Sequence, residues 1–167
     1  MPSYYNAITE KQAELIRRSP LFFVATADPQ LANGPEGIGP INLSPKGGVP
    51  LHIISPNRVA FLDYAGSGNE TARHSLAGGP ITVMVCSMEE NDAAIVRLYG
   101  HATITPLAHS PLAEQLLKAE AKELALPTRQ VIDIQVEKAL TSCGYGVPVL
   151  QFVRERRKAD RGRTYKA

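Results

Sequence analysis

The stretch "INLSPKGG", residues 41–48, places an amide, a hydroxyl, a proline and a lysine directly behind the apolar residues of a predicted strand. Side chains two residues apart in a strand point to the same face, so Asn42 and Ser44 would present hydrogen-bonding groups on one side. We expect Pro45 to mark the point where ladder pairing stops. The ammonium of Lys46 suits an anion such as a phosphate, although an ordinary loop lysine is the simpler interpretation of this residue alone.

A second polar cluster, "GSGNET" at residues 66–71, follows Asp63 and Tyr64 at the end of another predicted strand. A glycine-flanked turn that opens a helix leaves backbone N–H groups unpaired at the positive helix end, which favours an anion. The alternative is a helix cap formed by Ser67, with Glu70 at the third helical position. Neither GxxxxGK[ST] nor GxGxxG occurs, so a phosphate would not be held in either of those two ways. The side-chain donors expected at this turn are Ser67, Asn69 and Thr71.

The composition of the 167-residue chain excludes several classes of protein. Apolar residues make up 44% and charged residues 20%, as in an ordinary globular domain, and no segment approaches the roughly 20 apolar residues of a membrane helix. The 2 cysteines fit neither a disulfide framework nor a zinc set, so we expect no protein-bound metal. The chain start lacks the basic and apolar regions of a secretory signal, which predicts a cytoplasmic location.

Residues 154–167 form a basic tail. This segment carries seven basic and two acidic side chains, a net +5, which leaves −3 on the rest of a chain whose total is +2. A nucleic-acid role through the tail is one interpretation. Because no aromatic stacking platform is interleaved with these charges, we favour a solvated terminus and do not expect nucleic acid as a partner.

The polar clusters lie between predicted strands and short helices. Thr9 and Gln12 have the capping-box form and start a helix to about residue 19, and Ser110-Pro111 starts a later helix. Closely spaced strands with few helices indicate a single, mainly β domain over residues 1–167, a mostly antiparallel β-barrel with peripheral helices. Strands are expected at residues 21–27, 40–44, 51–55, 58–64, 81–88, 93–106 with a bend at Gly100, and 131–139, and helices at 9–19, 67–77 and 110–124.

Four blocks of sequence carry a resemblance to a known family: "FFVATADP…GPINLSPKGG", "NRVAFLDYAGSGNETARHSL", "VRLYGHATI" and "TSCGYGVPVLQFVRER". In this order they resemble the pyridoxamine 5′-phosphate oxidase-related family, flavoproteins with the FMN-binding split-barrel fold. The blocks span roughly residues 21–156, and the SPKG, GSGNET and CGYGVP strings together are typical of one branch. The resemblance implies an FMN cofactor.

The resemblance also implies which residues contact FMN. Lys46 corresponds to the basic end of the strand that contacts the flavin ring and phosphate. Where vitamin B6 oxidases have an arginine-lysine pair, this chain has Asn69-Glu70-Thr71, which leaves Lys46, with Arg73 as a further candidate, to supply charge. For Glu70, a role as a helix cap alone is the alternative to phosphate contact. We expect His74 on the helix surface. The implied cofactor-binding residues are Asn42, Leu43, Ser44, Lys46, Leu62, Asp63, Tyr64, Gly66, Ser67, Asn69, Glu70, Thr71 and Arg97.

Members of this family are usually homodimers with FMN at the subunit interface. Residues 97–100 and 142–148 are the segments we expect in the shared wall of the site. The alternative for the second segment is that Gly144, Gly146 and Pro148 only shape a turn.

The function implied is that of an FMN-dependent oxidoreductase in which hydride from a small-molecule donor or substrate passes through the flavin N5. Two other classes stay open: a flavin- or haem-binding module without catalysis, and a nucleic-acid-associated protein that uses the basic tail. The chain shows no RLxP motif near its end, so we do not expect authentic pyridoxamine 5′-phosphate oxidase activity.

Overall fold

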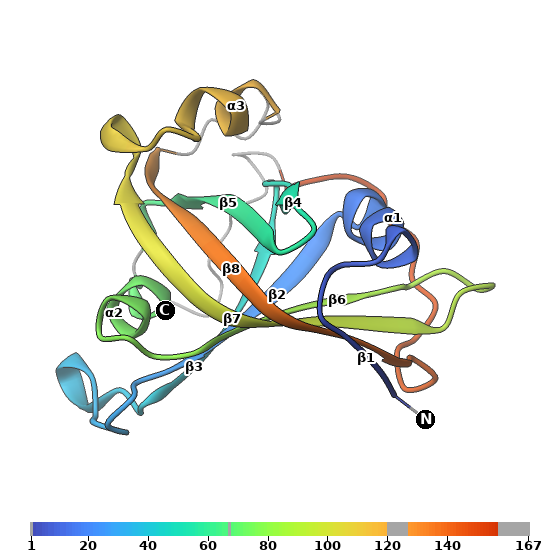
Figure 1. Cartoon of the computed structure of the whole chain (residues 1–167), viewed down its shortest axis with the longest axis horizontal. Coiled ribbons are helices and arrows are strands. Elements are labelled where there is room, and N and C mark those ends of the chain that lie inside the picture. The colour runs from blue at the N-terminus through green and yellow to red at the C-terminus, as the bar shows by residue number, and fades with distance from the viewer. Residues whose placement is uncertain (1, 67, 120–126, 157–167) are drawn as a thin grey trace.

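In the computed structural model, residues 2–66, 68–119 and 127–156 are described, and their strands form one curled, eight-stranded sheet with helices around it (Figure 1). All the described strand pairs are antiparallel. Two single turns of 3-10 helix, Pro35–Gly37 and Leu107–His109, lie in the connections. The main elements are β1 (Ser3–Tyr5), α1 (Glu10–Arg18), β2 (Leu21–Ala27), β3 (Ile41–Gly47), β4 (His52–Ser55), β5 (Arg58–Tyr64), α2 (Glu70–Leu76), β6 (Ile81–Cys86), β7 (Ala94–Pro106), α3 (Ala113–Lys118) and β8 (Thr128–Cys143).

The core lies inside the curl of the sheet. Strand β2 buries alternate residues, Phe22, Val24 and Thr26, whereas β5 buries five consecutive residues from Val59 to Asp63. Burial of one large apolar side chain contributes about 1.5–3 kcal/mol. The alternating pattern of β2 therefore turns one face inward, whereas β5 is covered on both faces. The mainly β fold with antiparallel pairing, expected from the strand spacing, is confirmed.

Two long strands, β7 and β8, join the two halves of the sheet. Their register shifts between Tyr99 and Gly100, the position at which the sequence predicts a bend. A Cβ at Gly100 would collide with the carbonyl oxygen of Gln135, so only glycine permits this close approach. Strand β8 extends beyond the predicted residues 131–139 at both ends: it begins at Thr128 and ends at Cys143.

The sheet is open along one side. Its strand order is β3-β2-β6-β7-β8-β5-β4, with β1 added on β8, so β3 and β4 are the two ends of the path. Side chains bridge this opening: Lys46 of β3 pairs with Asp63 of β5, and the Tyr64 hydroxyl donates to the Gly48 carbonyl oxygen at 3.1 Å. The polar cluster of "INLSPKGG" therefore lies where the barrel is split.

The prediction that ladder pairing stops at Pro45 is wrong. Pro45 lies opposite Phe23, and pairing of β2 with β3 continues through Lys46 to Gly47. Since β3 is an edge strand, a residue without an N–H is tolerated there when its nitrogen faces away from the ladder.

The helices agree with the sequence in one case and differ in two. Thr9 caps α1 as expected, with both bonds of the capping box present. Helix α2 begins at Glu70 with Asn69 at the N-cap and no capping bond from that side chain, so the predicted capping box with Glu70 at the third helical position is wrong. Helix α3 begins at Ala113 rather than at Pro111.

Some expectations fall outside the described residues. These are the contacts of Ser67, the end of the helix expected to reach residue 124, and residues 157–167 of the basic tail. Within the part of the chain that is described, no helix has the length and apolarity to cross a membrane.

Candidate functional site

A polar cavity of about 280 Å³ opens where β3 faces the end of β5. It is bounded by the inner face of β3, the end of β5 and the start of α2, so three segments separated in sequence meet there. The cavity brings together ten of the predicted residues: Asn42, Ser44, Lys46, Leu62, Asp63, Tyr64, Gly66, Asn69, Glu70 and Thr71.

Two predicted residues lie elsewhere. Leu43 points to the opposite face of β3, where 68% of its surface is exposed. Arg97 is on the outward face of β7 and donates to the Ser142 hydroxyl at 3.0 Å. This bond joins the two segments expected in a wall shared between subunits, and neither segment lines the cavity within one chain.

The β3 wall of the cavity follows the strand alternation. Asn42, Ser44 and Lys46 all face inward, as the sequence predicts, opposite Thr26, Val24 and Phe22 of β2. The Lys46 ammonium lies 3.0 Å from the Asp63 carboxylate and 5.9 Å from the centre of the Phe61 ring. The ammonium is therefore close to an opposite charge and to an aromatic face, and it borders the cavity. The Lys46 side chain is 20% exposed.

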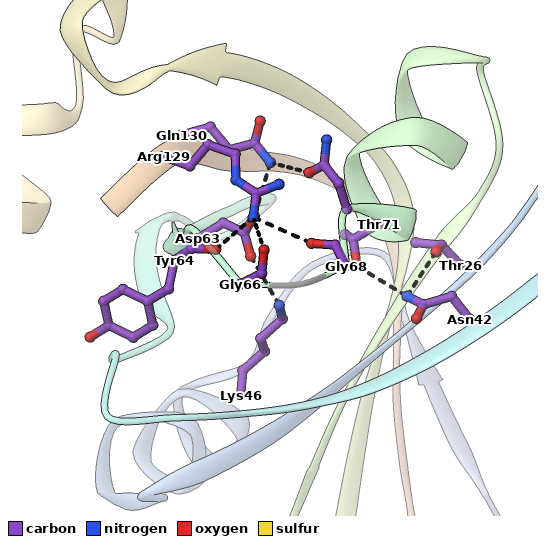
Figure 2. Close-up of polar contacts among 11 residues, drawn as sticks. Thr26, Asn42, Lys46, Asp63, Tyr64, Gly66, Gly68, Thr71, Arg129 and Gln130 are labelled. Carbon is purple, nitrogen blue, oxygen red and sulfur yellow. Dashed lines mark hydrogen bonds and ion pairs between the residues drawn. The ribbon is translucent and has the colours of Figure 1, made fainter. Parts of the chain in front are cut away.

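The amide of Asn42 is held by two threonine hydroxyls. Its Nδ2 donates to Thr26 Oγ1 at 3.3 Å and to Thr71 Oγ1 at 3.1 Å, which joins β3 to β2 and to α2 (Figure 2). Behind Thr26 lies His74, whose Nδ1 is 3.0 Å from the same hydroxyl. The expectation that His74 lies on the surface is wrong, because α2 packs this side chain fully inside.

Arg73 does not serve the cavity. Its guanidinium lies 3.1 Å from Nε2 of His74 and 4.0 Å from the Asp28 carboxylate, and Arg73 is absent from the cavity wall. A guanidinium can only donate hydrogen bonds, so Nε2 of His74 must be the acceptor of the bond from Arg73. Nδ1 of His74 is then the protonated nitrogen, and it donates to the Thr26 hydroxyl. Arg73 thus supports α2 through partly buried polar contacts and leaves Lys46 to face the cavity.

The opposite wall depends on β8, which the sequence did not connect with the site. Asp63 pairs with Gln130 and Tyr64 with Thr128, so Arg129 is the extra residue of a β-bulge. A bulge re-aims its side chain. The Arg129 guanidinium donates to the carbonyl oxygens of Tyr64, Gly66 and Gly68 at 3.1, 3.2 and 3.3 Å, and so holds the glycine turn along the cavity rim (Figure 2).

Gln130 connects the base of the same wall. Its Nε2 donates at 2.9 Å to Asp63 Oδ2 and at 2.9 Å to Asn69 Oδ1. The Asp63 carboxylate therefore accepts from Gln130 on one oxygen and from Lys46 on the other. The only sequence signal for these contacts is that Arg129-Gln130 directly precede a predicted strand, and strand pairing is needed to bring them to residues 63–69.

Comparison with known proteins supports one family. A family model described as pyridoxamine 5′-phosphate oxidase matches residues 8–143. The pyridoxamine 5′-phosphate oxidase family protein ustO of Aspergillus flavus is 34% identical over 155 residues, which cover 91% of this chain and 58% of that protein. The chain thus spans less than two thirds of the length of that relative.

Two solved structures share the fold at low identity. HupZ of Group A Streptococcus superposes with a TM-score of 0.59 at 22% identity, covering 79% of this chain and 91% of that one. An FMN-binding protein from Syntrophomonas wolfei gives a TM-score of 0.53 at 13% identity, covering 87% and 92%. The likeness concerns the fold alone. With the family match over most of the chain, it shows that the protein belongs to the pyridoxamine 5′-phosphate oxidase family and has the split-barrel fold.

Proposed function

We propose that this protein binds FMN with its phosphate end in the cavity beside β3, and that it acts as an oxidoreductase on a small-molecule donor or substrate. The observation that carries the proposal is the row of Asn42, Ser44 and Lys46, whose amide, hydroxyl and ammonium face one polar cavity. These groups are suited to a phosphate and a hydroxylated chain. We also keep the cytoplasmic location expected from the sequence.

The donor set fits a flavin better than a haem. Haem iron is usually held by histidine, cysteine, methionine or tyrosine. Among the described residues that line the cavity, none is histidine, cysteine or methionine, and the Tyr64 hydroxyl already donates to Gly48. The volume of about 280 Å³ lies just below the usual range of small-molecule sites, about 300–1,000 Å³, so the cavity suits one end of a larger ligand.

The chain would contribute binding and position to the reaction. FMN, when bound, supplies the hydride and electron chemistry. Lys46 would bind the phosphate, Asn42 would be oriented by its two threonine partners, and the glycine turn held by Arg129 would close the rim. No side chain of this site is assigned a proton-transfer role.

A homodimer is part of the proposal, because one face of the sheet carries apolar side chains toward the outside. The register places Pro45, Phe23, Met84 and Arg97 in one row across β3, β2, β6 and β7 on this face. Leu43 lies beside the row and is largely exposed. Burial of such a face in a second copy would cover these side chains and bring Arg97 into the interface.

Two measurements test the proposal. Purified protein should be yellow, or become so with added FMN, and release one FMN per subunit. It should have the mass of a dimer by light scattering, and Leu43→Asp should shift it toward the monomer. Colourless protein that fails to bind added FMN would overturn the cofactor assignment, and a monomeric wild-type protein would overturn the dimer.

A further inference from the structure

The cavity has an unusual charge balance for a site that receives a phosphate. Of the described residues that line it, Lys46 is positively charged, whereas Asp63 and Glu70 are negatively charged, which leaves a net charge of −1. The nearby Arg129 guanidinium donates to three backbone carbonyl oxygens and does not line the cavity. A phosphate would therefore enter a site that already holds more negative than positive charge.

Lys46 is also engaged before any ligand arrives. Its ammonium lies 3.0 Å from Oδ1 of Asp63, whose side chain is only 8% exposed. The second carboxylate oxygen of Asp63 accepts from Gln130 at 2.9 Å (Figure 2). Gln130 also donates to Asn69 Oδ1 at 2.9 Å. Because both oxygens have partners, the Asp63 carboxylate is fixed beside the Lys46 ammonium.

A phosphate bound to Lys46 would share this ammonium with Asp63. Two hydrogen bonds to one nitrogen place their acceptors roughly 4–5 Å apart, given the usual length of each bond. Like charges at that distance disfavour each other, most of all where water is partly excluded. The Asp63 carboxylate thus offsets part of the attraction between Lys46 and a phosphate.

We infer that Asp63 is a specificity-determining residue that lowers the preference of this site for phosphorylated flavins. The inference rests on the proposed function. It follows that the ring and hydroxylated chain of the flavin contribute most of the affinity. Riboflavin, which lacks the phosphate, binds nearly as well as FMN.

The test compares FMN and riboflavin by fluorescence titration at pH 7.5. The quantity of interest is the ratio of the riboflavin Kd to the FMN Kd, which isolates the phosphate from the rest of the flavin. Asp63→Asn keeps the size of the side chain and an acceptor oxygen but removes the charge. Asp92→Asn is the matched control, because Asp92 pairs with Arg18 at a distance from this cavity.

The expected wild-type ratio is below about tenfold, since a charge-assisted bond without opposition would exceed that value. Asp63→Asn should raise the ratio by about tenfold or more, and Asp92→Asn should leave it unchanged. If Asp63 had a purely structural role, the variant would weaken the binding of both flavins equally, and the ratio of their Kd values would stay constant.

Three results are decisive against the inference. A wild-type ratio above about tenfold overturns it even if Asp63→Asn fails to fold. So does a folded Asp63→Asn protein whose ratio equals or falls below that of the wild type. If wild-type protein binds neither flavin, the proposed function and this inference both fail. In the first two outcomes the protein still binds flavin, so only the inference fails.

Discussion

The β3 wall of the cavity and the β8 segment that supports the opposite wall differ in what their side chains contact. On the β3 wall, Asn42, Ser44 and Lys46 line the open space, and Asn42 and Lys46 also bond to neighbouring side chains. On the β8 side, Arg129 and Gln130 direct their donors onto the protein, to the glycine turn and to Asp63. The β3 wall is suited to bind a ligand, and the wall supported by β8 holds the binding groups in place. We therefore expect substitutions on the two walls to have different consequences.

The largest effect is expected on the β3 wall. Lys46→Ala should weaken FMN binding by more than about tenfold, because it removes a charge-assisted bond worth roughly 1.5–3 kcal/mol and leaves the Asp63 charge facing the ligand. Lys138→Ala is the control, since Lys138 is exposed and bonds to Asn6 far from the cavity wall. Titration with FMN checks the prediction. Equal affinity in Lys46→Ala would place the phosphate elsewhere.

Arg129→Gln tests the supporting wall. Each lost bond to a carbonyl of the glycine turn contributes about 0.5–1.5 kcal/mol, so we expect FMN affinity to fall about three- to tenfold through a less ordered turn. Amide hydrogen exchange should accelerate in residues 64–70 of the variant. If exchange there were unchanged while affinity fell, Arg129 would act on the ligand directly, and the distinction between the walls would break down.

Thr26→Val separates orientation from binding on the β3 wall. Valine has the shape of threonine but leaves the buried Nδ1 of His74 without its partner, which should lower the free energy of unfolding by about 1–3 kcal/mol. Asn42 keeps its bond to Thr71, so we expect FMN affinity to change by less than about threefold. Urea unfolding and FMN titration measure the two quantities. A loss of affinity larger than that of Arg129→Gln would assign Thr26 to the binding wall.

The smallest effect concerns His52 on β4, outside both walls. Burial lowers the pKa of His52 from the ordinary value of 6.5, and its Nε2 has no hydrogen-bond partner within the described residues. The unfolded chain therefore binds a proton more readily than the folded one, so this residue reduces stability as pH falls below 6.5. His52→Gln should reduce the drop in Tm between pH 7.5 and pH 5.5. An unchanged drop would assign the acid sensitivity to other groups.

The contrast between the walls also explains what could be predicted from sequence. Alternation within β3 places Asn42 and Ser44 on one face, and the apolar runs of β2 and β5 mark the strands beside them. These are local patterns of two to seven residues. They account for most strands and for the grouping of polar residues on the cavity side of β3.

The contributions of β8 could not be found in this way. Arg129 reaches the glycine turn because a bulge lies opposite the end of β5, about 65 residues earlier in the chain. Neither the pairing of β5 with β8 nor the bulge leaves a local signature. Similarly, the capping-box pattern at residues 67–70 predicted the wrong helix start: α2 begins at Glu70, and the Asn69 side chain accepts from Gln130 of β8 instead of capping the helix.

The central claim is that the β3 wall binds the phosphate end of a flavin. The most direct test is a crystal structure of the protein loaded with FMN. We predict phosphate oxygens within hydrogen-bond distance of the Lys46 ammonium, inside the cavity bounded by Asn42, Ser44 and Thr71. A flavin bound elsewhere, with Lys46 still paired with Asp63 and not with the ligand, would contradict the account.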